Sequence, residues 1–281
     1  MEFSYSYEEI LKRLPQRRAD SHKGTYGKVL IAAGSKNMCG AAYLAGKAAY
    51  RSGAGLVYLY TEECNRMILQ QLLPEAVLLT YEKENWNREE FRQILEEKDV
   101  VAAGPGLGTD PVKAEIVREV IRANDKKRIL DADALNILAA HPQLWSELSS
   151  PLVITPHLKE MERLSGRPVS NIKADLSGTA AEFSRTHGVV TVLKDARTRV
   201  SDGGEDCFVN TTGNHGMATG GSGDVLTGVI AGLAAQKMKL FEAAALGVAV
   251  HGMAGDLAAE KRGARSIMAG DIADAVLYGI S

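Results

Sequence analysis

Short apolar runs alternate with longer amphipathic or alanine-rich stretches along almost the whole chain. The apolar runs are rich in β-branched residues, and each is followed by a turn, which is typical of buried strands. They predict strands at Lys28–Ala33, Leu56–Tyr60, Ala76–Leu79, Val100–Ala103, Arg128–Asp131, Leu152–Ile154 and Val189–Leu193. The other stretches predict helices at Ala41–Arg51, Pro111–Ala123, Leu158–Leu164, Ile172–Thr186, Val225–Gln236 and Phe241–Glu260. Such alternation indicates stacked βαβ units around a mostly parallel sheet.

The pattern changes after Leu193. Two short polar strands are predicted at Arg197–Val200 and Cys207–Val209, and the turn Asp202-Gly203-Gly204 joins them. This arrangement is typical of an antiparallel hairpin, which we expect at the edge of the sheet. No linker, repeat or low-complexity segment interrupts the chain. The sequence therefore predicts one three-layer α/β domain over residues 1–281, with helices on both faces of the central sheet.

Composition narrows the class of protein. The 281 residues are 45% hydrophobic, which is enough for a large core. The net charge is −2 and basic residues are interleaved with acidic ones, which argues against a nucleic-acid or anionic-membrane partner. Three widely spaced cysteines form no C-x-x-C pair, and they fit a reducing compartment. We see no signal peptide and no apolar run near the ~20 residues that span a bilayer, so we expect a cytoplasmic protein.

The strongest functional signal is the segment 213–228, where a glycine-dense turn leads into an apolar helix. Gly220, Gly221 and Gly223 permit left-handed backbone angles and a close approach of a ligand. The free amides of the first helical turn would bind phosphate. A carboxylate in that turn would repel phosphate, so we interpret Asp224 as a base that acts on the attacking group. The alternative is a tight connection in which Asp224 only stabilises the start of the helix.

Ligands of open parallel sheets bind at the carboxyl ends of the strands. The segments that follow the predicted strands carry glycine or polar groups, namely Gly34-Ser35, Gly104-Pro105-Gly106-Leu107-Gly108, Asp131-Ala132-Asp133, Thr155-Pro156-His157 and Lys194-Asp195. The Gly104–Gly108 loop does not match the G-x-G-x-x-G fingerprint, because Asp110 stands where the third glycine should be. No G-x-x-x-x-G-K-[ST] loop occurs either, so a nucleotide must be bound by another scheme.

Five strings resemble those of the ADP/ATP-dependent NAD(P)H-hydrate dehydratases, which are members of the ribokinase-like superfamily. They are His22–Gly27, Gly104–Gly108, Asp131–Asn136, Thr155–Glu160 and Gly213–Leu226. The resemblance covers about residues 5 to 280 and keeps the family order. It implies a ribokinase-like fold and a hydro-lyase that repairs hydrated NADH or NADPH. Many relatives carry a fused epimerase domain, for which 281 residues leave no room, so we expect a stand-alone dehydratase.

The resemblance also implies a reaction. Asp224 would take the proton of the ring hydroxyl of the hydrate, and the oxygen would attack the terminal phosphoryl group of ADP. The ring nitrogen would then expel the phosphate ester, which gives NAD(P)H, AMP and phosphate. The catalytic set would be Asp224 with the amides of Gly221, Ser222 and Gly223, which stabilise the transferring charge. ADP is inferred by analogy with bacterial relatives. ATP as co-substrate and the choice between the NADH and NADPH hydrates stay open.

The family's binding residues fall on two groups of positions. Those for the hydrate are Ala41, Gly106, Gly108, His157 and Asp224, and those for the nucleotide are Lys194, Asp195, Ala196, Arg197, Thr198 and Gly223. Lys194 and Arg197 are cations directly after a strand and could meet phosphate, although a solvated hairpin with surface charges is the alternative. His157 could equally be a residue that only starts a helix. Glu160 is expected to act indirectly on a Mg²⁺ cofactor.

Two other functions compete with the dehydratase. A kinase of the same superfamily, specific for hydroxymethylpyrimidine or hydroxyethylthiazole, would use the same base and stop at the phosphate ester. A non-catalytic NAD(P)-binding module would use Asp224 only as a cap. The strings Thr155–Glu160 and Asp131–Asn136 favour the dehydratase. Relatives are commonly oligomeric, and the small residues of Gly40–Tyr50 and Ala243–Ala259 permit close helix packing, within or between subunits. We expect a homotetramer.

Overall fold

The computed structural model describes residues 1–280 and contains one ten-stranded sheet. The strand order is β1-β10-β9-β8-β7-β6-β5-β2-β3-β4. The seven strands β2 to β8 are all parallel to one another. Strand β9 pairs antiparallel with both β8 and β10. The strands are β1 Glu2–Phe3, β2 Lys28–Ala32, β3 Leu56–Glu62, β4 Val77–Tyr81, β5 Val100–Ala103, β6 Lys127–Leu130, β7 Val153–Ile154, β8 Val190–Leu193, β9 Arg199–Ser201 and β10 Cys207–Val209.

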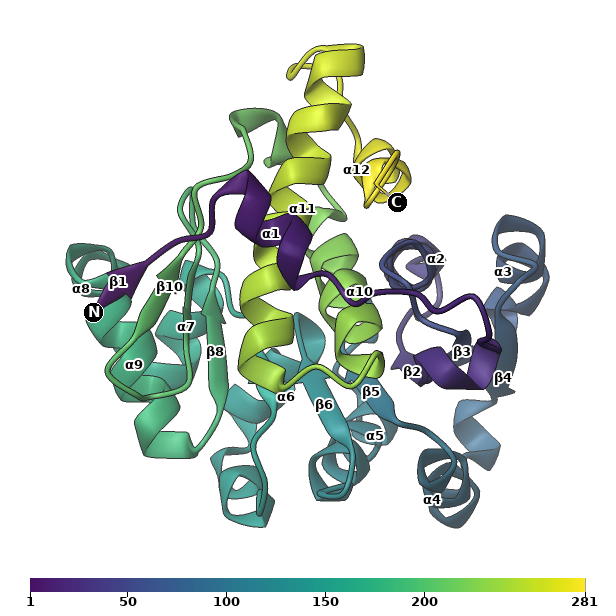
Figure 1. The fold of residues 1–281 in the computed structure, drawn as a ribbon. Helices are drawn as coiled ribbons and strands as arrows, with labels where there is room; N and C mark the ends of the chain where they lie inside the picture. Colours follow the sequence, from purple (N-terminus) through teal and green to yellow (C-terminus); the bar gives the residue numbers. More distant parts are fainter. Residues whose placement is uncertain (281) are drawn as a thin grey trace.

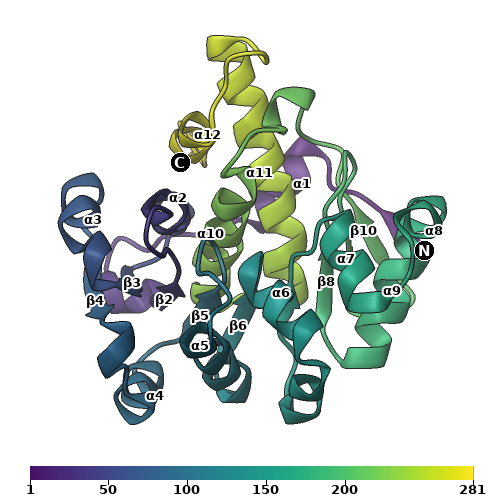
Figure 2. The same ribbon diagram turned by 180° about the vertical axis from the view of Figure 1, so that it is seen from behind.

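Helices cover both faces of this sheet (Figure 1). One apolar core lies under α1 Tyr7–Arg13, α2 Cys39–Arg51, α3 Arg66–Leu72, α10 Ser222–Ala235, α11 Leu240–Arg262 and α12 Ala269–Ala275. A second core lies on the opposite face (Figure 2), under α4 Arg88–Glu96, α5 Pro111–Arg122, α6 Asp133–Ala140, α7 Leu158–Ser165, α8 Val169–Ala174 and α9 Leu176–His187. The short 3₁₀ helices include η1 Lys23–Tyr26, η4 Pro142–Glu147 and η5 His215–Met217. The predicted three-layer α/β architecture is confirmed.

The predicted hairpin exists, but it does not form the edge of the sheet. Strand β1 pairs in parallel with β10 and takes the edge position instead. Phe3 of β1 lies against Phe208 of β10, with ring centroids 5.6 Å apart, and Tyr5 lies 4.7 Å from the same ring. A two-residue strand is too short to give a periodic pattern, so the sequence did not reveal it.

The predicted helix over Ile172–Thr186 is two helices. The helix is interrupted at Asp175. The Asp175 carboxylate accepts a hydrogen bond of 2.8 Å from the amide of Gly178 and so caps α9. The apolar periodicity continues across the break, because Ile172 of α8 and Phe183 of α9 face the same core. The break depends on a single capping side chain, which periodicity does not register.

Helix α11 corrects the expectation that no apolar run approaches the length of a membrane span. It has 23 residues and reaches a mean hydropathy of 1.2 over an 18-residue window, so by length and composition it is the one helix of residues 1–280 that could cross a membrane. However, 67% of that window is buried inside the molecule. The helix packs against α10, α12 and the strands β7, β8 and β9. Its apolar composition is therefore explained by its place in the core of this fold.

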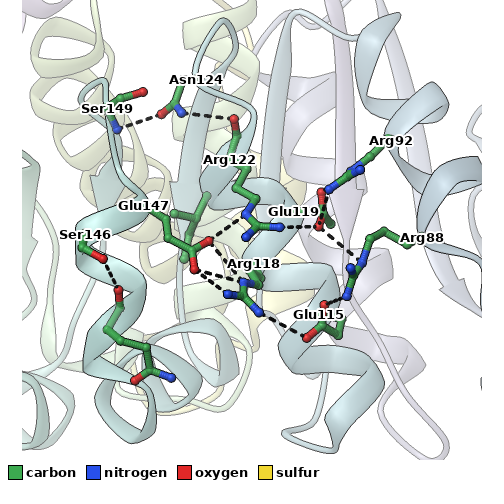
Figure 3. Close-up of polar contacts among 12 residues, drawn as sticks. Arg88, Arg92, Glu115, Arg118, Glu119, Arg122, Asn124, Ser146, Glu147 and Ser149 are labelled. Atoms are coloured by element: carbon green, nitrogen blue, oxygen red, sulfur yellow. Dashed lines mark hydrogen bonds and ion pairs between the residues drawn. The ribbon is translucent and has the colours of Figure 1, made fainter.

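A network of ion pairs joins α4, α5 and η4 on the other face (Figure 3). Glu119 of α5 is 2% exposed and accepts hydrogen bonds from Arg92, at 2.6 Å, and from Arg122, at 3.2 Å. Glu147 of η4 accepts from Arg118 and Arg122, each at 2.7 Å. A cavity of about 230 Å³ adjoins the network beside the chain that leads into β6, and its charged lining side chains include Arg92, Glu119 and Arg122. Each of these glutamates accepts hydrogen bonds from two arginines, so we assign the network to holding the helices together.

Candidate active site

The loops that follow β2 and β5 meet where the order of strands in the sheet reverses. The chain runs from β2 outward through β3 and β4, and from β5 outward in the opposite direction through β6, β7 and β8. The amide of Gly34 donates to the carbonyl of Pro105 at 2.9 Å, and the Ser35 hydroxyl donates to the carbonyl of Gly106 at 2.9 Å. Such a reversal leaves a crevice at the carboxyl ends of the strands, where open α/β sheets bind ligands.

The glycine-rich turn before α10 opens onto this edge. Gly221 is the N-cap residue of α10 with φ 89°, and no side chain caps the helix. The Ser222 amide donates to the carbonyl of Thr219 at 3.3 Å, and the Val225 amide donates back to Gly221 at 3.1 Å. Among residues 1–280, the amides between them, those of Gly223 and Asp224, have no backbone acceptor. Two adjacent free amides at the start of a fourteen-residue helix form a suitable anion site.

The structure corrects one detail of that turn. Of the three glycines expected to use left-handed angles, Gly221 alone has a positive φ. Gly223 is instead the second residue of the helix, and a Cβ there would lie 3.4 Å from the Nζ atom of Lys194. The absence of a side chain at Gly223 therefore leaves space beside the lysine ammonium. The backbone angles of Gly223 do not themselves require glycine.

Asp224 is the third residue of α10 and is partly buried. Burial, and after it the nearby negative charge of Asp131, raises the pKa of the Asp224 carboxyl to about 7, while Lys194 acts in the opposite direction. A carboxyl that titrates near neutrality can accept a proton from a substrate hydroxyl and release it again at the same pH. The geometry thus fits the role of base that the sequence predicted.

Lys194 follows β8 and forms an ion pair with Asp131, with 2.8 Å between Nζ and Oδ1. A second carboxylate, that of Glu160, lies 4.0 Å from the same ammonium. Burial by itself would lower the pKa of Lys194, but the charges of Asp131 and Glu160 outweigh it and raise that pKa, so the side chain is protonated. The predicted phosphate-binding cation is therefore already paired with a carboxylate from the loop after β6.

The rest of the predicted nucleotide segment lies in the turn between β8 and β9. Asp195, Ala196 and Arg197 are exposed, whereas Thr198 is buried and its hydroxyl donates to the carbonyl of Asp195 at 3.3 Å. The structure does not bring the Arg197 side chain into contact with Asp224 or Lys194 within residues 1–280. Its phosphate-binding role stays a prediction.

His157 opens α7, as one of the two interpretations predicted. Its Nδ1 atom accepts the amides of Lys159, at 3.1 Å, and of Glu160, at 3.2 Å, while its own amide donates to Glu160 at 2.8 Å. The imidazole is 49% exposed. The backbone of His157 forms an isolated parallel β-bridge with that of Lys194. Burial and the charge of Lys194 lower the pKa of His157, so the ring is neutral at neutral pH. The residue caps the helix and also borders the crevice.

Glu160 was expected to act on a metal ion. Its carboxylate is 5% exposed, burial raises its pKa, and its nearest cation is Lys194. The residues that the structure describes gather no group of three or more His, Cys, Asp or Glu side chains suited to a metal. The chain therefore offers no closed metal cage of its own at this edge.

The remaining positions predicted to bind the hydrate lie at the loops after β2 and β5. Gly106 has φ 55°, and a Cβ there would lie 2.9 Å from the Cβ of Ala41, so α2 packs directly on the loop after β5. The amide of Gly108 donates to the carboxylate of Asp133 at 2.8 Å. A Cβ on Gly108 would meet nothing closer than 3.9 Å, so space for a ligand adjoins this residue.

Three side chains at the site were not predicted from the sequence, namely those of Asp131, Thr227 and His251. Asp131 was quoted only as part of a string, yet its carboxylate is 1% exposed and joins Lys194 to Thr227 of α10. His251 of α11 is 8% exposed, its Nε2 atom lies 3.4 Å from the Ser222 hydroxyl, and burial lowers its pKa to about 4. Two features of the sequence could have indicated these residues. Thr227 lies one helical turn after Asp224, and His251 is a polar residue within the apolar run 243–254.

The string His22–Gly27 does not join this site. It forms η1 and the residue before β2, which places it at the amino end of that strand, on the opposite edge of the sheet. A Cβ on Gly55 would lie 1.7 Å from the carbonyl oxygen of Lys23, and one on Gly27 would lie 2.5 Å from that of Ala235. Close backbone packing explains Gly27 of this string and Gly55, which lies against it.

Comparison with known proteins places the chain in a family. The NAD(P)H-hydrate dehydratase family model matches residues 29–277. The bifunctional NAD(P)H-hydrate repair enzyme of Moorella thermoacetica is 43% identical over 272 residues, which are 95% of this chain and 51% of that protein. The ADP-dependent (S)-NAD(P)H-hydrate dehydratase of Bacillus subtilis is 35% identical over 270 residues, 96% of this chain and 95% of that one.

Solved structures agree with the sequence relatives. The crystal structure of the ADP/ATP-dependent NAD(P)H-hydrate dehydratase of Bacillus subtilis, co-crystallised with ATP and Mg²⁺, superposes with a TM-score of 0.84 at 33% identity. It covers 96% of this chain and 95% of its own. The chain spans about half the length of the bifunctional relatives that it matches and nearly the whole length of the Bacillus enzyme.

Proposed function

This chain belongs to the NAD(P)H-hydrate dehydratase family, and from that premise we propose that it is an ADP-dependent (S)-NAD(P)H-hydrate dehydratase. The observation that carries the proposal is the placement of Asp224. Its carboxyl, with a pKa of about 7, adjoins two free amides at the start of α10 and a protonated lysine. A base beside an anion site is what transfer of a phosphoryl group to a hydroxyl requires.

The reaction balances with these groups alone. Asp224 accepts the proton of the ring hydroxyl, whose oxygen forms a bond to the terminal phosphorus of ADP, and AMP leaves with the electrons of the broken P–O bond. The amides of Gly223 and Asp224 stabilise the charge of the transferring group. The ring nitrogen then supplies electrons as the C–O bond breaks and phosphate leaves. The departing phosphate accepts a proton from the adjacent ring carbon, which restores the double bond of NAD(P)H, and Asp224 returns its own proton to solvent.

The two ligands would occupy the two sides of Asp224. The hydrate lies against Ala41, Gly106, Gly108 and His157, where the loop after β5 leaves space. The nucleotide phosphates lie against Gly223 and Lys194, where the helix amides and the ammonium supply positive charge. The exposed turn 195–198 would bind the rest of the nucleotide.

Mg²⁺ fits this arrangement only as a companion of the nucleotide. Mg²⁺ in phosphoryl-transfer sites is commonly held by one or two carboxylates, water and the phosphates themselves. Glu160 would act on it through water, because Lys194 already lies 4.0 Å from the carboxylate.

One assay separates this function from the alternatives. The protein is incubated with hydrated NADH and either ADP or ATP, and recovery of reduced-nicotinamide absorbance is followed together with phosphate release. We expect recovery with ADP and equal amounts of AMP and phosphate. A small-molecule kinase would not restore the absorbance, and a binding module would neither restore it nor release phosphate. Lack of recovery with both nucleotides would contradict the proposal.

A further inference from the structure

Asp131 is a buried carboxylate that contacts two residues of the site, Lys194 and Thr227. It follows β6, and its side chain is 1% exposed. One oxygen accepts a hydrogen bond of 2.8 Å from Lys194, and the other accepts one of 2.8 Å from the hydroxyl of Thr227. Thr227 lies on α10, one turn after Asp224, so Asp131 links the loop after β8 to the helix that carries the base.

The position of Gly223 shows how close these groups are to the start of α10. A Cβ on that glycine would lie 3.4 Å from the Nζ atom of Lys194 and 3.8 Å from the Oδ2 atom of Asp131. The ammonium and the carboxylate therefore lie side by side against the first turn of the helix. Both charges act on Asp224, with opposite signs.

We propose that Asp131 is a positioning residue, whose carboxylate holds the ammonium of Lys194 beside the phosphate site and prevents it from pairing with the base Asp224. This inference rests on the proposed function for its meaning in catalysis. A lysine bonded to Asp224 would stabilise the ionised carboxylate and weaken it as a proton acceptor. Held by Asp131, the same lysine faces the nucleotide, and the base keeps its affinity for a proton.

The charged groups around Asp224 leave this role to Asp131. Asp133 is the other carboxylate that acts on the base, and it is occupied by the amide of Gly108 at 2.8 Å and by Asn136 at 3.3 Å. His251 contacts Ser222 at the start of the helix and is neutral near pH 7. Glu160 shares Lys194 with Asp131, but at 4.0 Å it is the more distant partner.

The test is a titration of the Asp224 carboxyl in the free protein. Carboxyl carbons of aspartate are labelled with ¹³C, the Asp224 signal is assigned by its loss in Asp224→Asn, and its midpoint is measured by NMR as pH is varied. In Asp131→Asn the neutral amide still accepts from Thr227 but no longer holds the ammonium. We expect the midpoint of Asp224 to fall by ~1 unit or more, because the charge of Asp131 no longer raises its pKa and because Lys194 then pairs with the base.

Two further variants keep the inference falsifiable even if Asp131→Asn fails to fold. Lys194→Gln leaves the charge of Asp131 uncompensated, so we expect the midpoint of Asp224 to rise. Thr227→Val removes a hydrogen bond but no charge, so we expect the midpoint to stay within a few tenths of a unit. Asp99→Asn, at the amino end of β2 where the carboxylate accepts from Lys28, is the matched control and should leave the midpoint unchanged.

Catalysis supplies the second readout. With ADP saturating, the acidic limb of the kcat profile should move to lower pH in Asp131→Asn, and kcat on the plateau should fall at least ~10-fold while KM for the hydrate changes little. If Asp131 holds Lys194 away from the base, Lys194→Gln should raise the midpoint of Asp224 by more in the Asp131→Asn background than in the wild-type background. Equal increases in the two backgrounds, or an unmoved midpoint in Lys194→Gln alone, would overturn the inference. If the wild-type protein restores no NADH, the proposed function fails, and the NMR titration still decides the placement of Lys194.

Discussion

At the scale of single residues, the site places an ionisable group where its charge is unfavourable. Burial and a neighbouring carboxylate both disfavour the ionised form of Asp224. Ionisable groups with strongly shifted pKa values cluster at functional sites, because a neutral side chain would fill the same space without an electrostatic cost. The sequence indicated the role of Asp224 from its glycine-rich setting, but its pKa is raised first by burial in the fold and then by the charge of Asp131, which is 93 positions away along the chain.

The raised pKa of Asp224 should make the free energy of unfolding depend on pH. The pKa of Asp224 is about 7 in the folded protein and 3.8 in an unperturbed aspartate. Because the folded value is raised, the associated stability is fully present below pH ~3.8 and is lost as pH rises through ~7. Asp224→Asn removes that loss, so we expect it to stabilise the protein by about 1–2 kcal/mol at pH 8, after allowance for partial exposure, and little at pH 4.

Thermal or urea unfolding at both pH values measures this difference. The matched control is Asp99→Asn, because the Asp99 carboxylate lies at the opposite edge of the sheet, where it accepts a hydrogen bond from the amide of Lys28. Equal effects of Asp224→Asn at pH 4 and pH 8 would contradict the raised pKa.

At the scale of elements, the helices α2, α10 and α11 pack through their small residues. A Cβ on Gly228 of α10 would lie 2.1 Å from the carbonyl oxygen of Ala45, and one on Gly232 would lie 2.5 Å from that of Ala49. A Cβ on Gly247 of α11 would lie 2.7 Å from Ile230. These glycines therefore serve packing within one subunit. The homotetramer stays a prediction that they do not support.

The first turn of α10 gives a prediction about nucleotide binding. Gly223 is in a helical conformation, so a larger residue there should fold, but its side chain would fill the space beside Lys194 and the free amides. We expect Gly223→Val to weaken ADP binding at least ~10-fold, which is ~1.4 kcal/mol. Calorimetric titration with ADP measures this loss.

The control has the same place in another helix. Gly270 is the second residue of α12, and a Cβ there would meet nothing within 4 Å. Gly270→Val should leave ADP affinity unchanged. Equal affinities of the Gly223→Val and wild-type proteins would show that the nucleotide phosphates do not lie at this turn.

The elements found from the sequence are those with a regular pattern over enough residues. Strands β2 to β8 and the long helices α2, α5, α10 and α11 were located to within a few residues. The seven-residue helices α1, α3 and α12 and the strand β1 were missed, because such short segments give too few apolar positions to define a period. The helices α4 and α6 were also missed, although α7, which has eight residues like α6, was located. The split between α8 and α9 was missed because it depends on the cap at Asp175.

At the scale of the whole molecule, the topology brings the site together. Residues from the loops after β2, β5, β6, β7 and β8 and from the start of α10 meet at one edge, because parallel strands all end there. This much followed from the sequence, since each loop was recognisable by its glycine or polar residues. The pairing of Lys194 with Asp131 did not follow, because it depends on which strands are neighbours in the finished sheet.

The remote network of α4, α5 and η4 belongs to the same scale. It lies on the face away from α10, and Glu119 there is as buried as Asp131. Its carboxylate is surrounded by arginines and its role is to join helices, whereas Asp131 is shared between a lysine and the helix of the base. Burial of a charge thus does not identify a functional residue without the contacts that it makes.

The most direct test of the account is the turnover of Asp224→Asn with hydrated NADH and ADP, compared with its affinity for ADP. We expect ADP binding to persist while kcat falls by roughly 10²–10⁴-fold, the usual contribution of a general base. In the wild-type protein kcat should rise with pH through about 7 as the carboxyl loses its proton. Near-native turnover of the variant at pH 8 would contradict the assignment of Asp224 as the base.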